Sequence, residues 1–425
     1  MEHENLYGRL HTWPKNRPVP EGAQVLPVRV NGRCFRCAGR RKALLPHGQS
    51  YCLDCLMIGR VSSLDCFLTI PEANDFAQLR QMRWQGQLTE RQQEASAALL
   101  ENLKAGRDQL LFAVTGAGKT EMLFPILDWA LDQRMRIAFV APRVDVVLEL
   151  APRIQAAFEV TMQVLYGDQV APYQYSQLVL ATTHQLMRFY RAFDLVIIDE
   201  VDAFPYRGNK TLERAIQQAK KEQGRLLWMT ATASPAMLRA VKKQKLILVS
   251  LPARFHGGPL PNLQVVYAPN WSKRLPGKIE KRLRQWLKEQ KPFFVFVPKV
   301  ADLERVCQHV QRALGNEGKG ETVHAKDPNR LGKVAKMRAG DFDFLVTTTI
   351  LERGVTLSNL QVLILGADDP TFTREALVQM AGRVGRDKNH SDGDVLAVVS
   401  GPSRRVKAAQ KEIRLVNERA ERRHR

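Results

Sequence analysis

Short apolar runs recur along most of the chain, and each is followed by a segment with helical spacing of its apolar positions. Five of these runs come first, at residues 109–114, 136–140, 177–181, 194–198 and 225–229. Strands that read as continuous apolar runs, alternating with helices, are typical of a parallel sheet that is covered on both faces. The pattern therefore predicts a first α/β lobe.

The same plan resumes after a break. Residues 251–261 concentrate glycine and proline, which suits a linker between domains. Further apolar runs at 292–297, 343–347, 361–365 and 394–400 predict a second α/β lobe. The last residues read as a basic helix with a weak apolar stripe at Ile413 and Val416, which either packs on the second lobe or stays solvated.

These patterns divide the chain into seven parts. They are an N-terminal extension (1–33), a four-cysteine module (34–70), a connecting helix (71–87), a first lobe (88–252), a linker (253–275), a second lobe (276–403) and a basic C-terminal helix (404–425). Two lobes joined by a linker predict a cleft between them. The expected fold class is α/β, with two parallel-sheet lobes preceded by a small metal-binding module.

The composition of the chain indicates what kind of partner it binds. The chain has 425 residues, 44% of them apolar, and a formal net charge of +21. Such an excess of positive charge favours a polyanionic partner, nucleic acid before an acidic membrane, although a merely solvated basic surface would look similar. The acidic start and the lack of a long apolar stretch predict a cytoplasmic protein with no membrane span.

Four of the six cysteines have the spacing of a metal site. Cys34 and Cys37 form one pair, and Cys52 and Cys55 form a second pair after fourteen intervening residues. Two such pairs can close a tetrahedral Zn²⁺ site that leaves no open coordination position, so we expect one structural zinc ion. Arginines and a lysine between the pairs favour nucleic-acid contact by this module, with protein docking as the alternative. Cys66 and Cys307 are expected to be buried free thiols.

A glycine-rich segment follows the first apolar run and precedes a helical pattern. It is Thr115-Gly116-Ala117-Gly118-Lys119-Thr120, the context required of a phosphate-binding loop. Backbone amides of such a loop converge on phosphate oxygens. Lys119 is expected to hold the β- and γ-phosphates of ATP, and Thr120 to ligate Mg²⁺. Ala113 stands where the motif usually has its first glycine.

Two further segments carry the remaining groups that ATP hydrolysis needs. Asp199 and Glu200 end an apolar strand, where ligands of open α/β sheets collect; Asp199 is the expected Mg²⁺ partner and Glu200 the base that orients water. Arg383 and Arg386 share one helix face and are expected to point toward the γ-phosphate. Which of the two arginines is the principal one stays open.

Taken together, these segments resemble the superfamily 2 helicase-translocases over residues 88 to 400, which implies two RecA-like lobes and a nucleic-acid-stimulated ATPase. In that pattern Gln92 resembles the adenine-reading glutamine, and Gly354 belongs to a motif that touches nucleotide. The resemblance implies coupling roles for Thr230, Thr232 and Gln379. It implies strand contacts for Pro142, Arg143, Thr182, Thr183, His184, Thr347 and Thr348.

Within that superfamily, the sequence Asp199-Glu-Val-Asp-Ala-Phe-Pro205 and a four-cysteine module ahead of the motor resemble the ComFA family of late-competence DNA-uptake ATPases. This implies an ATP-dependent single-stranded DNA translocase at the inner face of the cell membrane. Its partners would be a membrane DNA-uptake channel and a small phosphoribosyltransferase-like competence protein. A duplex-unwinding helicase of the PriA type and an ATP-gated DNA-binding adaptor are the alternatives, and RNA is not excluded.

Overall fold

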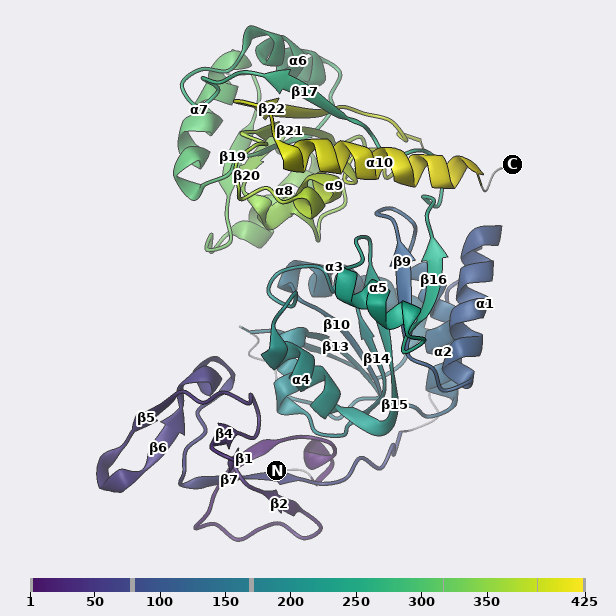
Figure 1. Ribbon diagram of the computed structural model, residues 1–425, viewed down its shortest axis with the longest axis vertical. Coiled ribbons are helices and arrows are strands. Elements are labelled where there is room, and N and C mark those ends of the chain that lie inside the picture. The colour runs from purple at the N-terminus through teal and green to yellow at the C-terminus, as the bar shows by residue number, and fades with distance from the viewer. Residues whose placement is uncertain (1–2, 77–80, 168–171, 316, 388, 423–425) are drawn as a thin grey trace. The chain divides into compact units, whose positions relative to one another are not determined.

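The computed structural model describes residues 3–422 apart from 77–80, 168–171, 316 and 388 (Figure 1). The chain divides into two compact units. The first contains Met1–Phe112 and Thr120–Ser250, and the second contains Ala113–Lys119 and Leu251–Arg425. The boundary after Ser250 lies close to the predicted start of the linker, but the phosphate-loop segment Ala113–Lys119 groups with the second unit.

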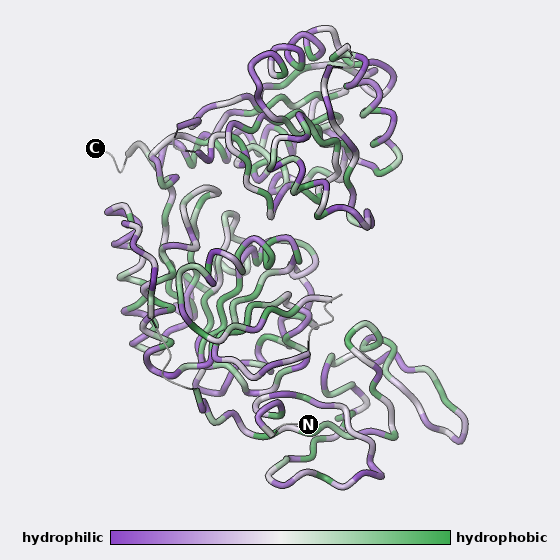
Figure 2. Tube along the Cα trace, turned by 180° about the vertical axis from the view of Figure 1, so that it is seen from behind, coloured by the Kyte–Doolittle hydropathy of each residue, from purple (hydrophilic) through white to green (hydrophobic). Residues whose placement is uncertain are grey.

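A seven-stranded sheet forms the centre of the first unit. Its order is β12-β13-β10-β14-β15-β9-β16. The strands are β9 (Gln109–Ala113), β10 (Ile137–Ala141), β12 (Met162–Leu165), β13 (Leu178–Thr182), β14 (Phe193–Ile198), β15 (Lys220–Thr230) and β16 (Ile247–Leu251). The inner strands pair in parallel, as the apolar runs predicted. In Figure 2 hydrophobic stretches follow the strands of this sheet, while the helices around them mix hydrophobic and hydrophilic positions.

In its described residues this unit has five α-helices: α1 (Glu90–Lys104), α2 (Phe124–Asp132), α3 (Val144–Ala157), α4 (Lys210–Ala219) and α5 (Pro235–Lys242). Helix α1 begins at a capping box, in which Thr89 and Gln92 bond each other's backbone N–H. Helix α4 begins at Asn209, whose side chain accepts from two backbone N–H groups. These caps satisfy amides that a helix leaves unpaired at its start.

The N-terminal region is built from short strands. β1 (His11–Pro14), β7 (Asp65–Thr69) and β2 (Gln24–Leu26) form one antiparallel sheet, so residues of the expected extension share a sheet with the end of the expected cysteine module. Two small hairpins pair β3 (Arg29–Val30) with β4 (Arg33–Cys34), and β5 (Lys42–Leu44) with β6 (Ser50–Cys52). One continuous apolar core runs from the cysteines through Phe67 into the strands of the large sheet.

The segment 71–87 differs from the expected connecting helix. Its described residues contain no helix, and its only described strand, β8 (Gln81–Met82), pairs with β11 (Phe158–Glu159). The side chain of Glu72 lies fully buried in an ion pair with Arg136, which also donates to the carbonyl oxygens of Tyr7 and Ser176. Asn74 has a positive φ of 53°, a conformation that a helix cannot contain. The buried ion pair of Glu72 and the left-handed backbone at Asn74 therefore account for a segment without helix over its described residues.

The second unit has a six-stranded sheet in the order β17-β22-β21-β18-β20-β19, with every neighbouring pair parallel. The strands are β17 (Leu263–Tyr267), β18 (Phe293–Phe296), β19 (Gly320–Val323), β20 (Phe344–Thr347), β21 (Gln361–Leu365) and β22 (Val395–Val399). β17 lies inside the expected linker. The helices are α6 (Gly277–Lys288), α7 (Leu303–Ala313), α8 (Arg330–Ala339), α9 (Arg374–Ala381) and α10 (Arg404–Arg422).

Helix α10 packs on the second unit. Val406, Ala409, Ile413 and Val416 form a buried stripe on its inner face. Arg374 on α9 pairs with Glu412 at 3.1 Å, and Asn417 exchanges two hydrogen bonds with the backbone of Leu260. The basic helix was predicted either to pack on the second lobe or to stay solvated, and in the structure it is packed. Across the described part of the chain, no helix has the length and apolar character needed to cross a membrane.

Candidate functional site

The glycine-rich loop lies between strand β9 and a short 3-10 turn, η4 (Glu121–Leu123), which leads into α2. Gly116 and Gly118 have φ values of 83° and 70°, a region that residues with a Cβ rarely enter. Ala117 is fully buried and Thr120 nearly so. This is the strand–loop–helix order that the sequence predicted, with one extra turn of 3-10 helix before the α-helix.

The same loop is bonded inside the second unit. Thr115 donates its hydroxyl hydrogen to the side-chain oxygen of Gln379 over 3.0 Å, and both side chains are buried. A Cβ added to Gly382 would meet the Cβ of Thr115 at 2.8 Å. Only glycine at position 382 therefore lets α9 end this close to the loop. Gln379 is thereby connected to the phosphate loop, which is compatible with the coupling role expected of it.

The two carboxylates follow strand β14 directly. The backbone N–H of Asp199 bonds the carbonyl of Val140 on β10, and Asp199 Oδ1 accepts from the N–H of Glu200 over 2.8 Å. Glu200 has a positive φ of 52°. The chain therefore turns sharply at Glu200, directly after the strand.

Asp202, for which no role was predicted, connects the acidic segment after β14 to the threonines at the end of β15. Asp202 accepts hydrogen bonds from the hydroxyls of Thr230 at 2.7 Å and Thr232 at 2.6 Å, and all three side chains are buried. The N–H of Thr232 in turn bonds Thr230 Oγ1. The acidic segment after β14 is thus fixed to the end of β15. Its signal in the sequence was the acidic residue two positions after Glu200.

The two arginines of the second unit do not lie on the expected helix face, because α9 ends at Ala381 and both follow it in a turn. Their surroundings also differ. Arg383 is 2% exposed and donates to the backbone carbonyls of Glu352 and Val355. Arg386 is less buried and donates to Gly382 O at 3.0 Å and to Thr356 Oγ1 at 3.3 Å. Arg383 thus holds the loop around Gly354, whose φ is 73°, while Arg386 lies nearer the surface.

The expected adenine reader has a structural role here. The side-chain oxygen of Gln92 accepts from Thr89 N at 3.0 Å and from Thr89 Oγ1 at 3.1 Å, and the residue is 5% exposed. This places Gln92 in the cap of α1. Reading of a base by the same side chain stays a prediction.

The residues expected to contact a nucleic-acid strand lie at strand ends. Pro142 and Arg143 follow β10, Thr182 ends β13, and Thr183 and His184 begin the 3-10 helix η5 (Thr183–Arg188). In the second unit Thr347 ends β20 and Thr348 follows it. The side chains of Thr183 and Thr347 are fully buried, and Thr347 donates to Val323 O. Both residues are therefore covered as whole residues, backbone included, and contact of a nucleic acid at these two positions stays a prediction.

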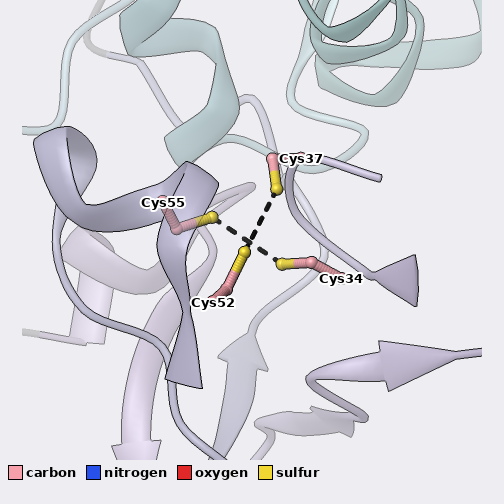
Figure 3. A group of neighbouring side chains, drawn as sticks. All are labelled: Cys34, Cys37, Cys52 and Cys55. Atoms are coloured by element: carbon pink, nitrogen blue, oxygen red, sulfur yellow. Dashed lines mark hydrogen bonds between the residues drawn. The ribbon is translucent and has the colours of Figure 1, made fainter. Parts of the chain in front are cut away.

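The four paired cysteines converge on one point (Figure 3). Their sulfur atoms all lie within 4.8 Å of one another, and the side chains are 0–2% exposed. Cys34 and Cys55 are 3.7 Å apart at sulfur, and Cys37 and Cys52 are 3.5 Å apart. A tetrahedron of thiolates around Zn²⁺, with Zn–S near 2.3 Å, requires sulfurs about 3.8 Å apart. The cluster therefore fits zinc.

Hydrogen-bond donors beside the cysteines also suit bound thiolates. Arg36 Nε donates to Cys55 Sγ at 3.4 Å, and the N–H of Gly39 donates to Cys37 Sγ at 3.3 Å. Such donors stabilise negative charge on the sulfurs. Cys66 and Cys307 are free and buried, as expected, and Cys66 lies against the carbonyl of Trp13.

Comparison with known proteins decides the family. The DEAD/DEAH box helicase family matches residues 89–241, and the Helicase conserved C-terminal domain matches residues 277–388. Competence protein ComFA of Bacillus subtilis strain 168 is 41% identical over 407 residues, which cover 92% of this chain and 87% of that protein. The chain belongs to the ComFA family. ComFA of Streptococcus pneumoniae strain R6 is 36% identical, over 91% of this chain and 90% of that protein.

As a member of the ComFA family with both helicase domains, the protein is a competence-related ATPase of helicase superfamily 2, and these domains imply ATP and Mg²⁺. A solved structure of the DEAD-box helicase Mss116 bound to ssRNA and UDP-BeF covers 77% of each chain, with a TM-score of 0.59 and 17% identity. At this identity the likeness concerns the fold. It confirms two parallel-sheet lobes, as the apolar runs predicted, with the RecA-like fold that the resemblance implied.

Proposed function

We propose that this ComFA-family ATPase moves along single-stranded DNA and so drives DNA uptake during natural competence. The observation that carries the proposal is the likeness to the two ComFA competence proteins over about nine-tenths of the chain. The excess of positive charge supports a polyanionic partner.

The proposal assigns roles around the nucleotide. The amides of the phosphate loop and Lys119 would hold the phosphates, and Thr120 and Asp199 would hold Mg²⁺. Glu200 would orient the attacking water. Arg383 and Arg386 would stabilise charge in the transition state, with Arg383 also fixing the loop at Gly354 through its two carbonyl contacts. Bound ATP and Mg²⁺ supply the reacting phosphoryl group and the charge that neutralises it.

Contacts to the strand would come from the ends of strands in both units, at Pro142, Arg143, His184 and Thr348, with the buried Thr182, Thr183 and Thr347 beside them. Motors that follow a backbone tolerate any sequence, and their affinity falls steeply with salt. The zinc-fitting module would add cations such as Arg33, Arg40 and Arg41, which lie exposed or partly exposed around the cluster. A membrane DNA-uptake channel and a small phosphoribosyltransferase-like competence protein are the proposed partners, at the cytoplasmic face of the membrane.

The test is the rate of ATP hydrolysis with no nucleic acid, single-stranded DNA, duplex DNA and single-stranded RNA, with Lys119→Ala as the blank. We expect stimulation by single-stranded DNA well above the other three. Movement is tested by displacement of streptavidin from biotin at one end of a single strand, for both polarities. ATP-dependent displacement at one end supports a translocase.

Other outcomes would contradict the proposal in distinct ways. Hydrolysis stimulated chiefly by forked duplexes, with strand separation, would indicate an unwinding helicase. Stimulation by RNA alone would exclude DNA uptake as the main role. Equal hydrolysis with and without nucleic acid at low salt, together with tight DNA binding, would indicate an ATP-gated adaptor.

A further inference from the structure

The segment that enters the second unit, Leu251–His256, lies along the phosphate loop. The N–H of Val114 bonds Leu251 O at 3.2 Å, and the N–H of Phe255 bonds Gly116 O at 3.1 Å. The segment Leu251–His256 is therefore bonded to the loop at two places, one near each of its ends. Among its side chains, Arg254 is 3% exposed. Sequence patterns gave this arginine no role.

Arg254 also reaches the turn that carries the two site arginines. Its guanidinium donates from Nη1 to Gly385 O and from Nη2 to Gly382 O, the latter at 3.4 Å. A ring nitrogen of His256 bonds the same Gly385 carbonyl at 2.9 Å. Gly382 and Gly385 precede Arg383 and Arg386 directly in the sequence. The carbonyls that shape the arginine turn are thus held by linker side chains.

The turn and the guanidinium fit each other closely. Gly385 has a φ of 66°, and a Cβ added there would meet Ser391 O at 2.4 Å and Arg254 Nη1 at 2.9 Å. On its other side, Arg254 lies against the phosphate loop, because a Cβ added to Gly116 would be 3.6 Å from Arg254 Cγ and 3.7 Å from its Nε. One side chain therefore touches both the phosphate loop and the arginine turn.

Burying the guanidinium of Arg254 at this position costs free energy. Burial, and then the charge of Arg386, lower the pKa of Arg254 to about 9. Among the described residues, its Nε has no hydrogen-bond partner, and no carboxylate pairs with it. Replacing a buried charge by an apolar side chain of similar volume often leaves stability unchanged or raises it. The charge at this position therefore suggests a functional use of the two carbonyl bonds.

We propose that Arg254 is a positioning residue for ATP hydrolysis, which ties the turn bearing Arg383 and Arg386 to the phosphate loop. The proposal rests on the ATPase activity of the family and not on single-stranded DNA as the substrate. Arg254 acts through the carbonyls of Gly382 and Gly385, so its loss frees Arg386 while leaving the phosphate loop and its Mg²⁺ ligands in place. Hydrolysis should therefore suffer far more than nucleotide binding.

The test compares Arg254→Met, which keeps the length of the side chain without its donors, with the matched control Arg405→Met. Arg405 also donates to a backbone carbonyl in the second unit, that of Asp368 at 2.9 Å, but it lies on α10. Hydrogen exchange is measured over residues 382–386 in nucleotide-free protein. Kinetics give kcat for ATP, and a fluorescent ADP analogue gives the affinity. Arg254→Lys, which cannot bond both carbonyls in the same way, serves if the methionine variant does not fold.

We expect exchange over 382–386 to rise about tenfold in Arg254→Met and to stay unchanged in Arg405→Met. The kcat should fall by about 10- to 100-fold, as for a misplaced catalytic group, with nucleotide affinity changed less than about threefold. Combining Arg254→Met with Arg386→Ala should cost little more than Arg386→Ala alone, because residues that act as a unit are not additive.

Three results would each overturn the proposal. They are a parental kcat in Arg254→Met, a double variant whose kcat falls by the product of the two single effects, and a loss of nucleotide affinity at unchanged kcat. The last would make Arg254 a nucleotide ligand instead. If single-stranded DNA failed to stimulate hydrolysis, the proposed translocase would fall, but the comparison of basal kcat values and of exchange would still decide the role of Arg254.

Discussion

Removing Asp202 should separate the acidic segment after β14 from the end of β15. Its two carboxylate oxygens accept one hydroxyl each, from Thr230 and Thr232, at 2.7 and 2.6 Å in a buried setting. These lengths are those of charge-assisted hydrogen bonds. Each such bond contributes about 1.5–3 kcal/mol to stability. Thr230→Val and Thr232→Val should each cost that amount, and Asp202→Ala about 3–6 kcal/mol.

A double-mutant cycle that combines Asp202→Ala with Thr232→Val isolates the hydrogen bond between Asp202 and Thr232. Once Asp202 is gone, Thr232→Val has no carboxylate bond left to remove, so the double variant should cost little more than Asp202→Ala. The coupling energy should then be about 1.5–3 kcal/mol. In hydrogen exchange this is roughly a 10- to 150-fold difference in rate, because each 1.4 kcal/mol changes an equilibrium tenfold.

The assay is hydrogen exchange, read by mass spectrometry, over peptides that cover β15 in nucleotide-free protein. Thr161→Val, at an exposed position of the same unit, is the matched control and should leave exchange of β15 unchanged. If the costs of Asp202→Ala and Thr232→Val add to within about 0.5 kcal/mol, the two side chains are independent and the reasoning is refuted.

Three further predictions concern the nucleotide, the metal and the nucleic acid. Glu200→Gln should bind a fluorescent ATP analogue like the parent while hydrolysis falls by about 10²- to 10⁴-fold, the range for loss of a general base; turnover at the parental rate would show that the base is misassigned. Cys52→Ser should lose zinc, measured by atomic emission, and lower solubility, whereas the control Cys66→Ser keeps the metal; a zinc-free but well-folded parent protein would contradict the site. The logarithm of the affinity for single-stranded DNA should fall linearly with the logarithm of salt concentration, with a slope near −0.7 for each phosphate contacted, and a flat titration would exclude backbone binding.

The sequence predicted the buried parts of the fold better than the edges. Each apolar run identified at the outset corresponds to an observed strand, with ends that differ by up to five residues. The strands that were missed include β12, β17 and β19, which lie at or beside the rims of the two sheets. A strand such as Gly320–Val323 is short and only partly buried, so its composition carries no continuous apolar signal. An edge strand is defined by its hydrogen bonds to a neighbouring strand, and a local sequence pattern carries no information about that neighbour.

In the candidate site, too, local motifs were predicted and contacts between distant residues were not. Short motifs identified the phosphate loop, the acidic pair, the cysteines and the arginines, because each is a local arrangement with a fixed spacing. Asp202 and Arg254 were not assigned, because their roles depend on partners about 30 and 130 residues away in the chain. Burial of Thr183 and Thr347 was also invisible, since threonine is common both at strand ends and on surfaces.

The buried pair of Glu72 and Arg136 has a practical consequence. Arg136 holds Tyr7 and Ser176 as well as Glu72, and the apolar core runs unbroken from the cysteines into the large sheet. The N-terminal region is therefore part of the first unit's fold rather than an appendage. A truncated protein that begins after residue 76 would carry a bare apolar face and an uncompensated buried cation. Its loss of activity would report misfolding, so the role of the metal must be studied by point substitution in the full chain.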